Sequence, residues 1–105
     1  PAAGDWRIHK NRLSAFYGTN LELLLRGLGV RTVLVVGVLT NQCVAATSKD
    51  AYYRDIKPIV VEEATGTTLP HLHAPAIEMI QVGWGAVHSL TQTLTNLEAL
   101  GIPNR

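Results

Sequence analysis

A run of seven β-branched and apolar residues, TVLVVGV at positions 32–38, constrains the fold of this chain more than any other feature. The run is apolar on both faces, which is typical of strands in parallel sheets that helices cover on both sides. It is too short to span a bilayer, which needs about 20 residues. The run therefore predicts a buried parallel strand and an α/β fold.

Segments that resemble strands and helices alternate along the rest of the chain. Further strands are predicted over residues 6–10, 58–62 and 85–90. Helices are predicted over residues 21–28, 41–54 and 70–80, and a last helix ends at Leu100. Thr19 followed by Glu22 forms a capping-box pattern for the first of these helices. Four strands alternating with helices predict a doubly wound, Rossmann-like parallel sheet between two helical layers, although such sheets usually have five or six strands.

The composition of the chain excludes several classes of function. Its 105 residues allow one domain, and a net charge of +1 gives no reason to propose nucleic acid or a membrane as a partner. Only 16% of the residues are charged and 47% are hydrophobic, so either the core is large or some surface meets another chain. The single cysteine cannot form an internal disulfide and no signal peptide is evident, so we expect a cytoplasmic protein.

Cys43 is the first candidate for a functional residue. It follows the strand predicted over residues 32–38, at the strand end where open α/β sheets bind their ligands. It also lies in the first turn of the predicted helix over residues 41–54, where unpaired N–H groups would stabilise a thiolate. A lone cysteine is equally well explained as a small buried hydrophobic residue. Lys10, after another predicted strand, could bring a cation to the same crevice, although most lysines are solvated.

Two segments of the chain resemble one enzyme family. Residues 10–21, KNRLSAFYGTNL, resemble the lysine segment of the isochorismatase-like cysteine hydrolases. Residues 37–44, GVLTNQCV, resemble the nucleophile segment of the same family, as do Thr47 and Asp50-Ala51 that follow. The segments occur in the family's order, and the resemblance extends through the last helix. It implies that residues 1–105 form the C-terminal portion of a single hydrolase domain, with about four strands of a six-stranded sheet.

The resemblance also implies a reaction and roles for individual residues. Members of this family use an Asp-Lys-Cys triad to hydrolyse amide C–N bonds through a thioester intermediate. Carried over, Cys43 would be the nucleophile and Lys10 the lysine of the triad. The family has a cis peptide bond that matches Val38–Leu39 here. The backbone N–H groups of Leu39 and Cys43 would then form an oxyanion hole.

The expected substrate also follows from the resemblance. Residues 14–19, SAFYGT, look most like members that act on ureido or carbamoyl groups, such as ureidoacrylate and biuret. Leu13, Tyr17 and Asn41 are the substrate-pocket residues that the resemblance implies, and it implies no cofactor and no metal. His71 and His73 have the spacing of metal ligands, but no third ligand is in view, and a polar helix start is the better interpretation.

The family's catalytic aspartate lies in a segment of its first strand, Asp-x-Gln-x-x-Phe, that this sequence lacks. Asp5 is too close to Lys10 to replace it. A missing central strand would also explain the low charged fraction, because surface that is normally buried would be uncovered. We therefore expect a complementary N-terminal polypeptide, a homo-oligomer, or both. The alternative is a non-catalytic interaction module that becomes active only when complemented.

Overall fold

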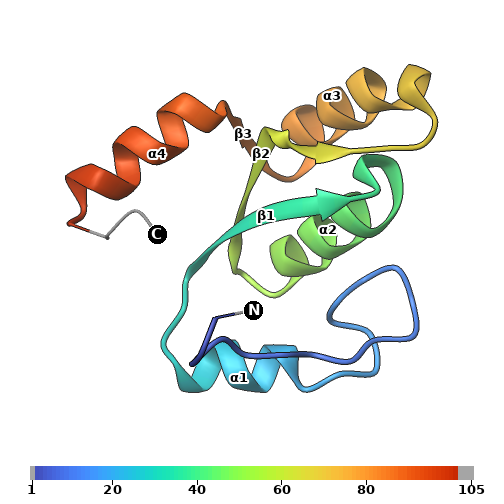
Figure 1. Ribbon diagram of the computed structural model, residues 1–105. Coiled ribbons are helices and arrows are strands. Elements are labelled where there is room, and N and C mark those ends of the chain that lie inside the picture. Colours follow the sequence, from blue (N-terminus) through green and yellow to red (C-terminus); the bar gives the residue numbers. More distant parts are fainter. Residues whose placement is uncertain (1, 102–105) are drawn as a thin grey trace.

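The computed structural model describes residues 2–101. Strands β1 (Thr32–Val38), β2 (Lys57–Gly66) and β3 (Ala86–His88) form one parallel sheet in the order β1-β2-β3. The α-helices are α1 (Leu21–Gly27), α2 (Ala45–Tyr53), α3 (His73–Gly83) and α4 (Leu90–Ala99), and the short helical turns are η1 (Thr40–Val44) and η2 (Pro70–Leu72). Figure 1 shows α2 and α3 together on one side and α4 apart from both, beside β2 and β3. The predicted α/β fold with a parallel sheet is confirmed, but the described residues form three strands and not four.

The main core lies between the sheet and helices α2 and α3. Side chains alternate between the two faces of a strand, so Val35 of β1 and Val60 of β2 point toward the helices. They pack with Ile77 and Ile80 of α3 and with Val44, and all five residues are buried. Because Val44 belongs to the turn that follows β1, core packing attaches this turn to both the sheet and α3.

The N-terminal segment packs against α2 without forming a strand. The strand predicted over residues 6–10 is wrong, because these residues have no strand beside them with which to form a hydrogen-bonded ladder. The segment is anchored further along by Phe16, which is 6% exposed and packs against Ala51 and Ile56. The guanidinium of Arg54 lies 5.0 Å from the centre of the Phe16 ring. An aromatic anchor therefore replaces the expected strand pairing.

The capping box predicted for the first helix does not form. Asn20 is the N-cap residue of α1 and makes no side-chain capping bond. The hydroxyl of Thr19 accepts a hydrogen bond from the N–H of Leu21, at 3.2 Å. Glu22 instead forms an ion pair with Arg54 at the end of α2, with 2.7 Å between the charged atoms. Glu22, which the local pattern assigned to the capping box, thus forms a contact between two helices instead.

Other element boundaries also differ from those predicted. The helix predicted over residues 41–54 is divided into the π-helical turn η1 and the α-helix α2. The helix predicted over residues 70–80 is likewise divided into η2 and α3, which continues to Gly83. The last strand ends at His88 because Ser89 caps α4, its hydroxyl accepting from the N–H of Gln92 at 3.0 Å. Within residues 2–101, none of these helices is long and apolar enough to cross a membrane.

β1 lies at an edge of the sheet, so its outer row of backbone N–H and C=O groups faces away from β2. The side chains on the face turned away from α2 and α3 are apolar and open: Leu34, Val36 and Val38 are 42%, 57% and 67% exposed. Parallel sheets are normally covered on both faces, and long exposed edges promote association. We call this apolar surface of Leu34, Val36 and Val38, with the free edge of β1, the open face.

The core assignment predicts a large difference between two neighbouring residues of α3. Replacing Ile80, which is 0% exposed, by alanine should lower the free energy of unfolding by about 2–5 kcal/mol, because it leaves a cavity between helix and sheet. The matched change Met79→Ala, at a side chain 61% exposed, should have an effect of about 0.5 kcal/mol or less. Urea unfolding measures both, and equal midpoints for the two variants would contradict this assignment of the core.

Candidate active site

Lys10 and Cys43 lie together at the carboxyl end of β1, although they are far apart in the sequence. The Nζ atom of Lys10 lies 3.5 Å from the Sγ atom of Cys43. The same ammonium donates hydrogen bonds to the carbonyl oxygens of Arg12, at 2.9 Å, and Leu13, at 3.3 Å. Its own segment therefore holds the cation in place beside the half-buried thiol.

The turn η1 carries Cys43 between β1 and α2. The peptide bond between Val38 and Leu39 is cis, at the position that the resemblance implies. The Leu39 carbonyl accepts hydrogen bonds from the N–H groups of Gln42 and Val44, both at 3.1 Å. The N–H of Cys43, which lies between these two donors, makes no bond to that carbonyl. Backbone N–H groups in the first turn of a helix favour a negative charge nearby.

A second contact joins this turn to α3. The hydroxyl of Thr40, a residue that is 0% exposed, lies 2.9 Å from Nδ1 of His73. His73 is the first residue of α3, whereas His71 is exposed in the preceding turn η2. Both histidines thus lie at a helix start, as predicted from the sequence. That prediction did not include the hydrogen bond between His73 and Thr40. Nothing in the sequence pattern indicates a contact between elements that are separated by a whole strand and helix.

The segment that carries Lys10 reaches the site through a bond to α2. The N–H of Ala15 donates to the hydroxyl of Thr47, at 3.0 Å. Thr47 is one helical turn beyond Cys43, so this bond fixes the N-terminal segment close to the thiol. Together with the burial of Phe16, it accounts for the position of Lys10 without a strand at residues 6–10.

No carboxylate in residues 2–101 forms a hydrogen bond or ion pair with Lys10 or Cys43. Asp5 accepts a hydrogen bond from the N–H of Ala2, at 2.8 Å. Asp50 lies about two helical turns, or 10 Å, beyond Cys43, and its carboxylate is 3.6 Å from Arg54. Neither occupies the place of a triad aspartate. The same residues contain no group of three His, Cys, Asp or Glu that could hold a metal ion.

The three residues expected in the substrate pocket are partly brought together. Leu13 and Asn41 line one groove of about 390 Å³, whose other walls include Lys49 and Trp84. Tyr17 is 66% exposed and lines a neighbouring hollow with Leu13. Cys43 is not among the residues that line either one. The Oδ1 atom of Asn41 is buried and has no hydrogen-bond partner among the described residues, so it needs a donor from elsewhere.

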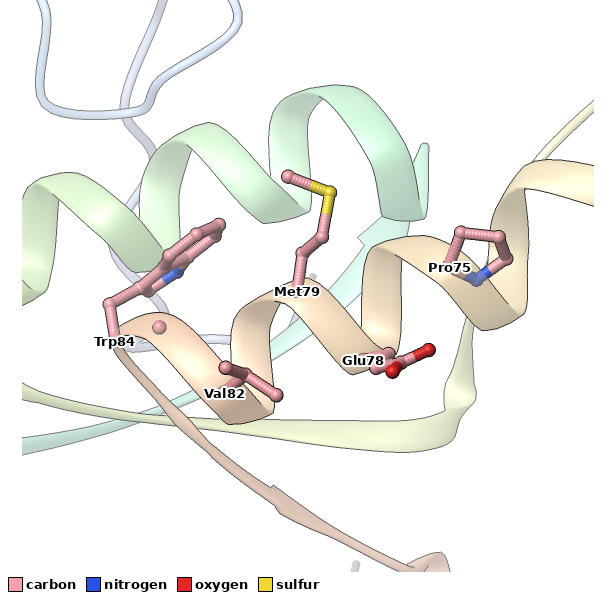
Figure 2. A pocket seen from close by; sticks show the side chains of 6 residues that line it. Pro75, Glu78, Met79, Val82 and Trp84 are labelled. Carbon is pink, nitrogen blue, oxygen red and sulfur yellow. The ribbon is translucent and has the colours of Figure 1, made fainter.

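A further hollow, of about 370 Å³, lies along the exposed side of α3 (Figure 2). Figure 2 shows Met79 and Trp84 directed toward α2, with Glu78 and Val82 on the same exposed side of α3 and Pro75 near the start of the helix. The lining is mostly apolar, and Glu78 is its one titratable residue. It contains neither Lys10 nor Cys43, so the candidate chemistry lies elsewhere, at the end of β1.

Known proteins with similar sequences are amide hydrolases by name. A ureidoacrylate amidohydrolase of Methylobacterium radiotolerans is 37% identical over 106 residues, which cover 100% of this chain and 40% of that protein. An N-carbamoylsarcosine amidase of an Arthrobacter species is 37% identical over 100 residues, which cover 95% of this chain and 38% of that protein. The chain thus spans less than half the length of these relatives.

Solved structures show the same relationship. An isochorismatase family protein from Desulfovibrio vulgaris superposes with a TM-score of 0.82 at 36% identity, covering 94% of this chain and 52% of that one. An isochorismatase-like hydrolase from Alkaliphilus metalliredigens superposes with a TM-score of 0.88 at 28% identity, covering 91% and 52%. Residues 1–93 match the isochorismatase domain family. On this match over most of its length, the chain belongs to the isochorismatase family.

Proposed function

We propose that this chain carries the nucleophile and the lysine of an amidohydrolase that cleaves a C–N bond in a small amide or ureido compound. The observation that carries the proposal is the 3.5 Å approach of Lys10 Nζ to Cys43 Sγ at the carboxyl end of β1. The thiolate is the reactive form of cysteine, and a neighbouring cation stabilises it. The named activities of the two relatives favour ureido and carbamoyl groups as the substrate class.

In the proposed reaction, Cys43 Sγ attacks the carbonyl carbon of the substrate and its proton passes to a carboxylate. The N–H groups of Leu39 and Cys43 donate hydrogen bonds to the oxyanion. The carboxylic acid then protonates the leaving nitrogen, the C–N bond breaks, and a thioester remains. Water attacks the thioester, which releases the acid product and restores the thiol. Lys10 balances the negative charge that develops next to it.

The carboxylate of this scheme comes, we infer, from polypeptide outside the described residues. Within residues 2–101 no strand pairs with the outer edge of β1, and β1 ends one residue before the turn that carries Cys43. The carboxyl ends of parallel strands meet at one edge of a sheet. A further strand parallel to β1 would therefore bring its last residues close to Cys43, and a helix connected to that strand would cover Leu34, Val36 and Val38. The relatives are more than twice as long as the segment matched, which leaves room for such a strand.

The open face also supports the second candidate function, an interaction module without catalysis of its own. In that case the apolar face of β1 would bind a partner polypeptide, and the approach of Lys10 to Cys43 would have no chemical consequence. The two functions differ in one respect, because only the amidohydrolase requires the thiol.

Replacing the thiol tests the nucleophile directly. In the enzyme complemented with the polypeptide that supplies the carboxylate, Cys43→Ala should reduce ammonia release from ureido and carbamoyl substrates to background, because alanine has no nucleophilic atom at this position. The urea midpoint should stay close to that of the parent, since the change removes one sulfur from a half-buried side chain. Activity within about threefold of the parent would exclude Cys43 as the nucleophile.

Lys10 is tested without turnover, through alkylation of the thiol. Lys10→Ala should slow the reaction of Cys43 with iodoacetamide at neutral pH several-fold, because the thiolate loses its nearest cation. Cys43 is the only cysteine, so the labelled mass reports this site alone. The matched change Lys57→Ala, at the start of β2, should leave the rate unchanged. Equal pH profiles for the Lys10→Ala variant and the parent would place Lys10 in solvent, outside the site.

The 105-residue chain by itself should neither hydrolyse these substrates nor remain monomeric. The described residues offer Cys43 no carboxylate, and general acid–base catalysis typically contributes about 10²–10⁴-fold. The open face has no charged residue to oppose association. Light scattering and an ammonia assay on the same sample measure both properties. An active monomer would contradict the prediction and make Asp5 and Asp50 the first groups to test as the base.

A further inference from the structure

We propose that His73 is a positioning residue for the nucleophile, which it holds through a hydrogen bond to Thr40. Nδ1 of His73 and Oγ1 of Thr40 are 2.9 Å apart, and Thr40 begins the turn that carries Cys43. The inference rests on the proposed role of Cys43 and adds to it a residue from α3, an element that supplies neither member of the Lys10–Cys43 pair.

The environment of Thr40 makes this bond important for the turn. Thr40 is 0% exposed, so its hydroxyl cannot turn to water if the bond to His73 is lost. Two side-chain hydrogen bonds join η1 to other elements of the described chain. One is the bond between Thr40 and His73, and the other is the approach of Lys10 to Cys43. A turn with so few polar attachments depends strongly on each of them.

The position of His73 allows it to act as a rigid support. His73, Ile77 and Ile80 are spaced so that they share one face of α3. Ile77 and Ile80 pack in the same core cluster as Val44, the last residue of the turn. The same helix face therefore holds the turn at both of its ends, by apolar contact at one and by the histidine hydrogen bond at the other. Moving either attachment would shift Cys43 relative to Lys10.

The first test measures the reactivity of Cys43 in the 105-residue chain and needs no substrate. His73→Leu should lower the rate constant for iodoacetamide roughly tenfold, because the thiol leaves its place beside Lys10. His73→Asn places an amide nitrogen near the position of Nδ1 and should restore the rate to within about twofold. His71→Leu, at the exposed histidine of η2, is the matched control and should react like the parent. A rate for His73→Leu equal to or above that of the parent would overturn the proposal.

A second pair of variants keeps the test decisive if His73→Leu does not fold. Thr40→Ser retains the hydroxyl and should react like the parent, whereas Thr40→Val removes it and should be slow. In a protein that already carries Thr40→Val, adding His73→Leu should change the alkylation rate constant little further. Each of the two changes alone already removes the same hydrogen bond. Equal rates for Thr40→Ser and Thr40→Val, or independent effects of the two changes, would overturn the proposal.

Kinetics in the complemented enzyme separate this inference from the proposed function. His73→Leu should lower kcat about 10- to 100-fold with little change in KM, because a displaced nucleophile affects the chemical step more than binding. An unchanged kcat would overturn the positioning role. If the parent enzyme releases no ammonia, the proposed function fails, while the alkylation rates still decide whether His73 positions Cys43.

Discussion

The burial of Val44 in the core is the interaction on which the candidate site depends most. Val44 is 2% exposed and packs against Val35 and Val60 of the sheet and Ile77 of α3. Burying a valine side chain fully stabilises a fold by about 1.5–3 kcal/mol, and close-packed cores leave little freedom of movement. Because Val44 directly follows Cys43, the energy that packs the core also fixes the backbone of the thiol. The sheet and two helices thus determine where the thiol lies.

The lysine of the site is held in a different way. Lys10 is exposed and belongs to a segment without regular secondary structure, which is attached to α2 through Phe16 and the bond between Ala15 and Thr47. Segments attached by a few contacts open at a lower cost than core elements do. The site therefore combines a thiol held by the core with a cation held by these few surface contacts. Weakening the contacts should change the reactivity of the thiol at a smaller cost in free energy than unfolding the core requires.

The parts of this structure that follow from local patterns are those that the sequence predicts well. Residues 32–38 have the bounds predicted for β1, because a run of β-branched residues favours extended backbone. The predicted burial of this strand is wrong within the described residues, since only Val35 is buried and one face of β1 has no helix over it. The place of Cys43 after a strand follows from the same run. Residues 6–10 show that a strand pattern fails where no neighbouring strand is present. The bond from Thr40 to His73 was not predictable, since hydrophobic periodicity within one segment contains no information about contacts between distant elements.

Within the described residues, the open face and the lack of a carboxylate beside Cys43 both occur at β1, the strand at which the sheet ends. Leu34, Val36 and Val38 are apolar because their positions suit an interior. A parallel strand added to this edge would place its last residues near Cys43, and a helix packed on the open face would cover these side chains. The two effects are nevertheless separable. An occupant that covers the open face but brings no carboxylate would remove the exposed apolar surface without supplying the proposed base, so solubility alone would not test the proposed reaction.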